Sequence, residues 1–254
     1  MKLVVDIGNT NIVLGLKNKE KWQHIWRLET NKKASEYQYS LKINNLLWEE
    51  GLNPNDINHT ILSTVVPELK NPFIHLLYKL NHTDVIVMDK HVYPQLNLNI
   101  LNPDEIGSDL VANVLSAHNK YRQNSIIIDF GTALTFTVVD RTGKILGVNI
   151  APGIKTAINA LSDKTSQLDP VPLILPKNPL GQDTQTAIQN GVLIGYTGLI
   201  SHMIEVIKNK VGQNYKVIAT GGLSEILSHH LPQIEIIDKH LTLDGLAMLP
   251  DFVD

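Results

Sequence analysis

Short apolar runs alternate with segments of helical spacing along most of the chain. Residues 3–6 form a continuous apolar run that ends in a carboxylate, which predicts a buried strand. Residues 12–16 and 22–28 follow after short polar turns, so the chain is predicted to open with a β-meander. Leucines then recur at helical spacing over residues 35–50, and residues 60–66 return as a strand. This alternation predicts an α/β fold.

The second half of the chain begins in the same way as the first. Residues 3–10 read LVVDIGNT and residues 126–133 read IIIDFGTA. Each segment is an apolar strand followed by Asp-x-Gly and a threonine, then by a second strand and a polar turn. The repeat predicts a duplicated domain, with one copy over residues 1–120 and the other over residues 121–254.

Composition narrows the class of protein. The 254 residues carry 22 Lys and Arg against 25 Asp and Glu without a block of like charge, so no nucleic-acid partner is expected. The absence of cysteine excludes a disulfide framework and a thiolate nucleophile, and it suits a reducing cytoplasm. Polar residues such as His202 and Glu205 interrupt the apolar stretch 191–207, so we expect a soluble protein without a membrane span.

The two Asp-x-Gly turns are candidate phosphate-binding hairpins. Glycine lets the backbone approach a phosphate closely, while exposed N–H groups, Thr and Asn side chains donate to its oxygens. Asp6 would then hold a metal ion, although a single such segment is also an ordinary hairpin turn. Two copies favour a nucleotide site, because carboxylates beside a triphosphate require bound cations.

Two further segments are ambiguous by themselves. Residues 218–222 (IATGG) predict a strand that enters a double glycine before a helix, where a ribose or a flat ring can lie close to the backbone at Gly221 and Gly222. Asp109 stands at the start of a predicted helix. It is either a helix cap or a general base that accepts a hydroxyl proton during phosphoryl transfer.

The ordered set of motifs resembles the type III pantothenate kinases of the actin-like ATPase superfold. Residues 6–11 (DIGNTN), 107–109 (GSD) and 129–132 (DFGT) carry the resemblance, and residues 151–153 (APG), 181–184 (GQDT) and 219–222 (ATGG) continue it. The resemblance implies duplicated ribonuclease H-like domains with a nucleotide cleft between them. It also implies ATP-dependent phosphorylation of pantothenate, the first step of coenzyme A synthesis, by a homodimer.

The resemblance also implies roles for individual residues. Asp109 is the proton acceptor, Asp129 binds a monovalent cation (K⁺ or NH₄⁺), and Asp6 holds Mg²⁺ through the phosphates of ATP. The ATP contacts are Asp6, Ile7, Gly8, Asn9, Thr10, Asn11, Ile12, Val13 and Thr132, joined by Gly221 and Gly222. The pantothenate contacts are Gly107, Ser108, Asp109, Leu110 and Thr184.

Two positions depart from the family pattern, and both belong to the acceptor side. Leu110 follows Asp109 where the family has arginine, and Ile100 stands where a tyrosine is usual. Lys155 is a candidate replacement for the missing cation. Two alternatives therefore stay open, namely a kinase of another small alcohol and a non-catalytic nucleotide-binding regulator.

Overall fold

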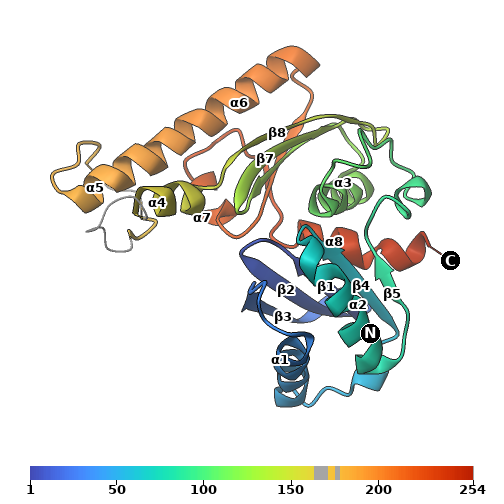
Figure 1. The fold of residues 1–254 in the computed structure, drawn as a ribbon. Coiled ribbons are helices and arrows are strands. Elements are labelled where there is room, and N and C mark those ends of the chain that lie inside the picture. Colours follow the sequence, from blue (N-terminus) through green and yellow to red (C-terminus); the bar gives the residue numbers. More distant parts are fainter. Residues whose placement is uncertain (163–170, 175–177, 254) are drawn as a thin grey trace. The chain divides into compact units, whose positions relative to one another are not determined.

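The chain consists of two compact units. The computed structural model describes residues 1–162, 171–174 and 178–253 (Figure 1). The first unit comprises Met1–Lys120 together with Leu241–Asp254, and the second comprises Tyr121–His240.

The first unit is built on a five-stranded sheet whose order is β3-β2-β1-β4-β5. The central strand β1 pairs antiparallel with β2, which pairs antiparallel with β3, while β4 and β5 continue parallel on the other side. The predicted opening meander is therefore present. The strands are β1 (Lys2–Ile7), β2 (Asn11–Asn18), β3 (Lys21–Glu29), β4 (His59–Thr64) and β5 (Val85–Val87).

Alternation along the strands sends side chains to two separate cores. Leu3, Val5 and Ile7 pack with the helices α1 (Glu36–Glu49) and α2 (Pro67–Asn81). Val4 faces the other way, toward α3 (Ser108–Tyr121) and α8 (Leu241–Ala247). Because Asp6 follows the same alternation as Val4, its side chain lies on the α3 face of the sheet.

The second unit repeats this topology. Its central strand β6 pairs antiparallel with β7, which pairs with β8, and parallel with β9, which pairs with β10. This is the connection order of the first sheet, so the predicted duplication and the α/β fold class are confirmed. The strands are β6 (Ser125–Phe130), β7 (Ala133–Val139), β8 (Ile145–Pro152), β9 (Lys216–Thr220) and β10 (Ile236–Ile237).

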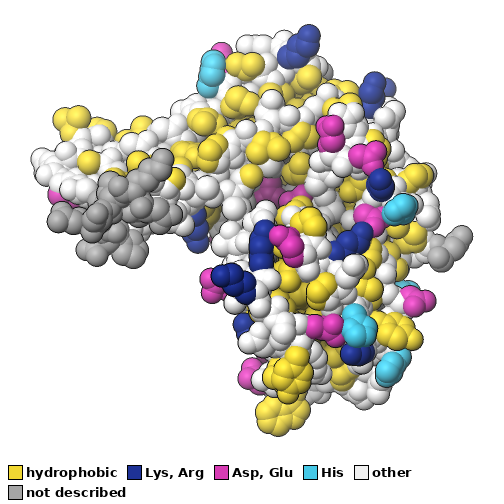
Figure 2. Space-filling model, viewed as in Figure 1, with side chains coloured by type: hydrophobic (Ala, Val, Ile, Leu, Met, Phe, Trp, Pro, Cys, Tyr) yellow, Lys and Arg dark blue, Asp and Glu magenta, His cyan; other side chains and the backbone are white. Residues whose placement is uncertain are grey.

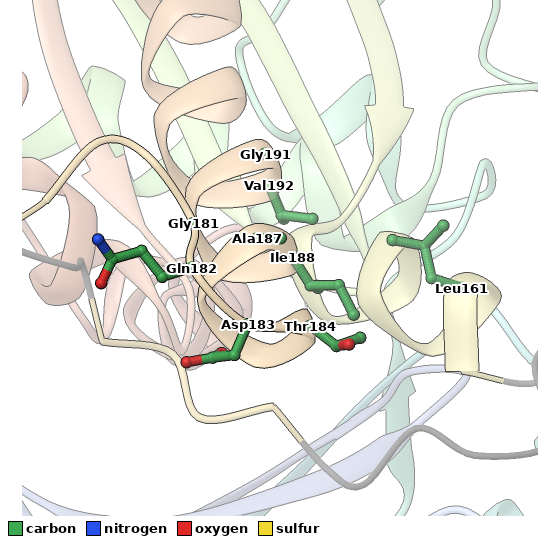
Figure 3. A pocket seen from close by; sticks show the side chains of 9 residues that line it. All are labelled: Leu161, Gly181, Gln182, Asp183, Thr184, Ala187, Ile188, Gly191 and Val192. Carbon is green, nitrogen blue, oxygen red and sulfur yellow. The ribbon is translucent and has the colours of Figure 1, made fainter.

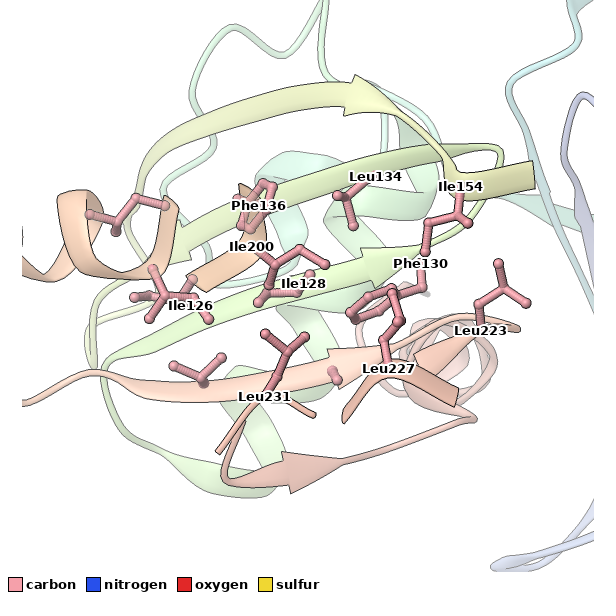
Figure 4. Close-up of a cluster of buried hydrophobic side chains, with 14 of the residues drawn as sticks. Ile126, Ile128, Phe130, Leu134, Phe136, Ile154, Ile200, Leu223, Leu227 and Leu231 are labelled. Carbon is pink, nitrogen blue, oxygen red and sulfur yellow. The ribbon is translucent and has the colours of Figure 1, made fainter. Parts of the chain in front are cut away.

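Helices bury one face of the second sheet. Ile126, Ile128 and Phe130 of β6 pack in one cluster with Ile200 and Leu227 (Figure 4). The helices are α4 (Ile154–Ser162), α5 (Thr184–Gln189), a π-helical turn (Asn190–Ile194), α6 (Gly195–Val211) and α7 (Ser224–Ser228).

The helical run Thr184–Val211 corrects the expectation that polar residues make the stretch 191–207 unable to span a membrane. Its 28 residues are long and apolar enough to cross a membrane by length and composition alone, although Tyr196, His202 and Glu205 interrupt it. A long helix that covers a sheet passes the same test, and Ile200 and Ile204 of this run are buried in the core of the second unit.

The other face of this helical run is exposed, and it carries apolar side chains together with the exposed pair His202 and Glu205. Ile194, Leu199 and Val206 are each more than one third exposed, and a Cβ on Gly195 or Gly198 would meet open space. Figure 2 shows hydrophobic side chains along this helix. The exposed face is a candidate surface for a partner.

The end of the chain belongs to the first unit, not to the second unit as the predicted domain 121–254 requires. Leu243 and Leu246 of α8 pack in the cluster that includes Val4 and Val111. A Cβ on Gly245 would lie 1.9 Å from the carbonyl oxygen of Ala112, so α8 lies directly against α3. This long-range packing has no signature in the local apolar pattern, which is why the sequence did not reveal it.

Candidate functional site

The turn of the first hairpin presents polar groups to solvent. Gly8 donates its N–H to the carbonyl oxygen of Asn11 at 2.9 Å, which closes the turn between β1 and β2. Asn9, Thr10 and Asn11 are exposed. In the predicted phosphate loop, Ile7 and Ile12 are fully buried core residues and Val13 is half-buried, so these three side chains hold the hairpin and leave the turn to contact a ligand.

Asp6 and the start of α3 converge within the first unit. Asp6 pairs with Ser63 on the neighbouring strand β4, so their side chains project from the same face of the sheet. The hydroxyl oxygen of Ser63 lies 3.0 Å from that of Ser108, and both serines are buried. Asp109 is the next residue, so two of the predicted carboxylates reach one end of the same sheet.

Asp109 lies in the first turn of α3. Its Oδ1 accepts a hydrogen bond from the backbone N–H of Leu110 at 2.8 Å. Burial raises the pKa of the Asp109 carboxyl, although this hydrogen bond acts in the opposite direction. A Cβ on Gly107 would lie 2.5 Å from Oδ1, so glycine is needed there for the carboxylate to keep its position. A half-buried carboxylate of raised pKa is suited to accept a proton.

The glycine turns of the second unit gather around its own hairpin. A Cβ on Gly221, whose φ is +89°, would lie 2.4 Å from Oδ1 of Asp129. Gly153 donates its N–H to the carbonyl oxygen of Thr132 at 2.9 Å, and Thr156 donates its hydroxyl to the same oxygen at 2.7 Å. Thr132 and Gly222 are exposed at this end of the sheet. Three of the recognised motifs therefore meet within one unit.

Two hydroxyls that the sequence reading missed flank Asp129. Thr220 pairs with Asp129 on β9 and Thr135 pairs with it on β7, so all three side chains share one face of the sheet. Thr220 is fully buried and Thr135 is 8% exposed. In the described part of the chain neither hydroxyl oxygen has a hydrogen-bond partner. A carboxylate between two such oxygens fits a hard cation, because hydroxyl and carboxylate oxygens are its preferred ligands.

Clusters of carboxylate and imidazole side chains are the usual sign of a metal site built by protein ligands alone. Among residues 1–162, 171–174 and 178–253, no three His, Asp or Glu side chains are placed to hold a metal ion. A cation at Asp6 or Asp129 would therefore take its remaining ligands from phosphate, hydroxyl, carbonyl or water oxygens.

Thr184 lines a cavity of about 780 Å³ in the second unit. Figure 3 shows Thr184 and Ile188 of α5 pointing toward α4, which carries Leu161. Asp183 caps α5 by accepting the N–H of Thr186 at 2.8 Å, and this bond lowers the pKa of Asp183. The cavity is lined by Leu161, Gly181, Gln182, Asp183, Thr184, Ala187, Ile188, Gly191 and Val192.

Both residues that depart from the family pattern are at least partly buried in the structure. Leu110 is only 7% exposed, and Ile100 packs against an apolar cluster that contains Tyr93. Lys155 is exposed in the first turn of α4, in the second unit. The structure therefore places Lys155 and Asp109 in different units.

Tyr93 is a residue near Asp109 that sequence reasoning missed. Burial raises the pKa of its phenol, and the carboxylates of Asp89 and Asp109 raise it further. The phenol is thus within electrostatic range of Asp109. This tyrosine lies in a short 3₁₀ turn, Tyr93–Gln95, outside every motif found in the sequence.

Comparison with known proteins agrees with the motifs. Residues 2–206 match the family model described as type III pantothenate kinase.

Several solved structures resemble the chain over nearly its whole length. A protein from Campylobacter jejuni described as a Baf family transcriptional activator is 21% identical, with 98% of this chain and 97% of that chain covered and a TM-score of 0.59. A protein described as a 2-dehydro-3-deoxygalactonokinase from Sinorhizobium meliloti is 9% identical, with 98% and 96% covered and a TM-score of 0.61. MreB 5 of Spiroplasma citri is 11% identical, with 98% and 96% covered and a TM-score of 0.54. At these identities the likenesses show the fold, which is that of the actin-like ATPases.

Proposed function

Because the chain belongs to the type III pantothenate kinase family, we propose that it transfers the γ-phosphoryl group of ATP to the hydroxyl of pantothenate, giving 4'-phosphopantothenate. The observation that carries this proposal is the family match over residues 2–206, which includes the first hairpin, Asp109 and the second hairpin. The half-buried position of Asp109, next to the Ser63–Ser108 contact, supports it.

In the proposed reaction the acceptor hydroxyl attacks the γ-phosphorus. A new oxygen–phosphorus bond forms, the bond to the β-phosphate oxygen breaks, and ADP leaves. The hydroxyl proton passes to the carboxylate of Asp109, which is therefore the general base. Gly107 and Ser108 hold that carboxylate at the start of α3, and Thr184 is a pantothenate contact.

The turn of the first hairpin, with Asp6 below it, is proposed to bind the phosphates of ATP and, through them, Mg²⁺. Backbone N–H groups and the side chains of Asn9, Thr10 and Asn11 are suitable donors to phosphate oxygens. Mg²⁺ offsets the charge that develops on the phosphates during transfer. Thr132, Gly221 and Gly222 are proposed as further nucleotide contacts.

Asp129, Thr135 and Thr220 are proposed to hold the monovalent cation, K⁺ or NH₄⁺. If they do, K⁺ should raise the Tm of the wild type more than Na⁺ does at equal ionic strength, because a ligand that binds only the folded state stabilises it. Thr220→Val should abolish the difference. Thr137→Val is the matched control, since Thr137 is an equally buried threonine without a hydrogen-bond partner in the described residues, and it pairs with Ile127 instead of Asp129. Equal K⁺ and Na⁺ effects on the wild type would refute this site.

The acceptor carboxylate lacks the usual arginine. A charge-assisted hydrogen bond contributes about 1.5–3 kcal/mol, so its loss raises the KM for pantothenate roughly 10- to 100-fold. Leu110→Arg should lower that KM without changing the KM for ATP. If the wild type already saturates at micromolar pantothenate and the variant is no better, another cation binds the carboxylate.

A homodimer is proposed through the exposed face of the helical run Thr184–Val211, which carries Ile194, Leu199 and Val206. Gly191 of this run lines the Thr184 cavity, and a Cβ on it would meet no atom within 4 Å, so the run borders the cavity at a point without side-chain cover. A second copy of the chain would cover both. Light scattering on an active preparation should give twice the mass of one chain, and a monomeric mass would contradict the proposal.

The enzyme is tested by ADP release with pantothenate and with a panel of other small alcohols. Turnover with pantothenate that disappears in Asp109→Asn supports the proposal. Turnover with another alcohol alone indicates a different acceptor. The uncharged, buried Leu110 favours one second candidate, a non-catalytic nucleotide-binding regulator, which would bind ATP and release no ADP with any acceptor.

A further inference from the structure

Thr30 makes two hydrogen bonds to the turn of the first hairpin. Its hydroxyl donates to the carbonyl oxygen of Gly8 at 2.7 Å, and its backbone N–H donates to the carbonyl oxygen of Thr10 at 3.0 Å. Thr30 follows the end of β3, twenty residues along the chain from the turn that it contacts. It belongs to none of the motifs that identify the family.

These two bonds determine where the neighbouring N–H groups point. The described chain contains no cis peptide bond, and in a trans peptide the carbonyl of one residue points opposite to the N–H of the next. With the Gly8 carbonyl turned toward Thr30, the N–H of Asn9 points away from Thr30. With the Thr10 carbonyl turned toward Thr30, the N–H of Asn11 does the same. Thr30 thereby orients two donors of the turn toward its opposite side.

The segment that carries Thr30 is itself anchored. Asn31 donates its N–H to the hydroxyl of Tyr39 at 2.8 Å, and that hydroxyl donates back to the carbonyl oxygen of Asn31 at 3.0 Å. Tyr39 is 1% exposed and packs against Phe73, with their ring centroids 4.9 Å apart. The turn is therefore connected through Thr30 and Asn31 to the core between α1 and α2. A rigid support of this kind keeps donors in place before a ligand arrives.

We propose that Thr30 is a positioning residue for phosphate binding, which holds the Gly8 and Thr10 carbonyls so that the Asn9 and Asn11 N–H groups face the phosphates. The proposal rests on the proposed function of the first hairpin as the ATP phosphate loop. Thr30 acts through the turn and is not itself a phosphate ligand.

The first arm of the test needs no nucleotide. Thr30→Val keeps the shape of the side chain and removes only the hydroxyl. Amide exchange at Gly8 and Thr30, whose N–H groups donate to the Asn11 and Thr10 carbonyls of the turn, should therefore become about 3- to 10-fold faster, as expected for the loss of one hydrogen bond. Thr30→Ser keeps the hydroxyl and should restore slow exchange. Thr60→Val is the matched control, because the Thr60 hydroxyl also takes part in a hydrogen bond, which Asn81 donates to it at 3.1 Å, at the opposite end of the same sheet. It should leave exchange in the turn unchanged.

The second arm measures the Kd of ATP by calorimetry and the KM for ATP by steady-state kinetics. Thr30→Val should raise both about 3- to 10-fold while the KM for the acceptor stays constant, and Thr30→Ser should behave as the wild type. The proposal is overturned if Thr30→Val changes neither exchange nor ATP affinity, or if Thr60→Val changes both equally. A different result would separate the two claims. If the wild type binds no ATP but Thr30→Val still speeds amide exchange in the turn, then Thr30 supports the turn and the proposed nucleotide function is rejected.

Discussion

Replacing Asp109 by asparagine should strongly reduce turnover and, at neutral pH, stabilise the protein. Asparagine has nearly the same shape and keeps an oxygen that can accept the Leu110 N–H, now 2.8 Å from Oδ1. It cannot take a proton, so kcat should fall by about 10²–10⁴, equivalent to roughly 3–5 kcal/mol of transition-state stabilisation. ATP affinity should survive.

The stability change follows from the sign of the pKa shift. Burial raises the pKa of Asp109 in the folded protein above its unfolded value of about 3.9. The folded state is therefore favoured by this group below that pH, and the favourable contribution is lost as pH rises through the folded pKa. At neutral pH the wild type holds a disfavoured charge that the neutral variant lacks. For a chain of this size, each kcal/mol of unfolding free energy gained by removing this charge raises the Tm by about 2–4 °C.

The assay is steady-state ADP release together with thermal unfolding of both proteins from about pH 4 to pH 8. The Tm advantage of the variant should be largest at neutral pH and should vanish as the pH approaches 4. Asp104→Asn is the matched control, since Asp104 is an exposed carboxylate paired with Lys90 at 2.6 Å, and this pairing lowers its pKa. The control variant should have the kcat of the wild type and no higher Tm than the wild type. A variant of Asp109 with unchanged kcat, or with a lower Tm than the wild type at neutral pH, would refute the reasoning.

Two further predictions concern the attachment of α8. Asp244 accepts hydrogen bonds from Lys120 at 2.7 Å and Lys17 at 3.0 Å, which outweigh burial and lower its pKa. Asp244→Asn should therefore lower the unfolding free energy by about 1–3 kcal/mol at pH 7, as measured by denaturant unfolding. The difference should be full above the unfolded pKa of Asp244 and should disappear as pH falls through its lower folded pKa. Gly245→Ala should destabilise the protein by about 1–3 kcal/mol or more, because the added Cβ meets a backbone carbonyl 1.9 Å away, whereas Gly147→Ala, where a Cβ meets nothing within 4 Å, should leave the Tm within about 1–2 °C of the wild type.

Local pattern was sufficient to predict the two hairpins. The runs 3–5 and 126–128 are continuous and apolar because both faces of these central strands are buried, and the Asp-x-Gly that follows each marks the start of a turn. The same sequence repeat predicted the duplication, and the motif order predicted the family. These features depend on residues a few positions apart, which is the distance over which periodicity and turn chemistry act.

The tertiary structure decided what depends on residues far apart in the chain. It returned Leu241–Asp254 to the first unit, brought Thr30 to the turn at Gly8, and placed Thr220 and Thr135 on either side of Asp129. A threonine at the end of a strand looks the same in sequence whether its hydroxyl faces solvent, a carbonyl or a cation. Strand pairing and helix packing decide which of these it meets, because they bring distant residues into contact through forces that leave no local periodicity.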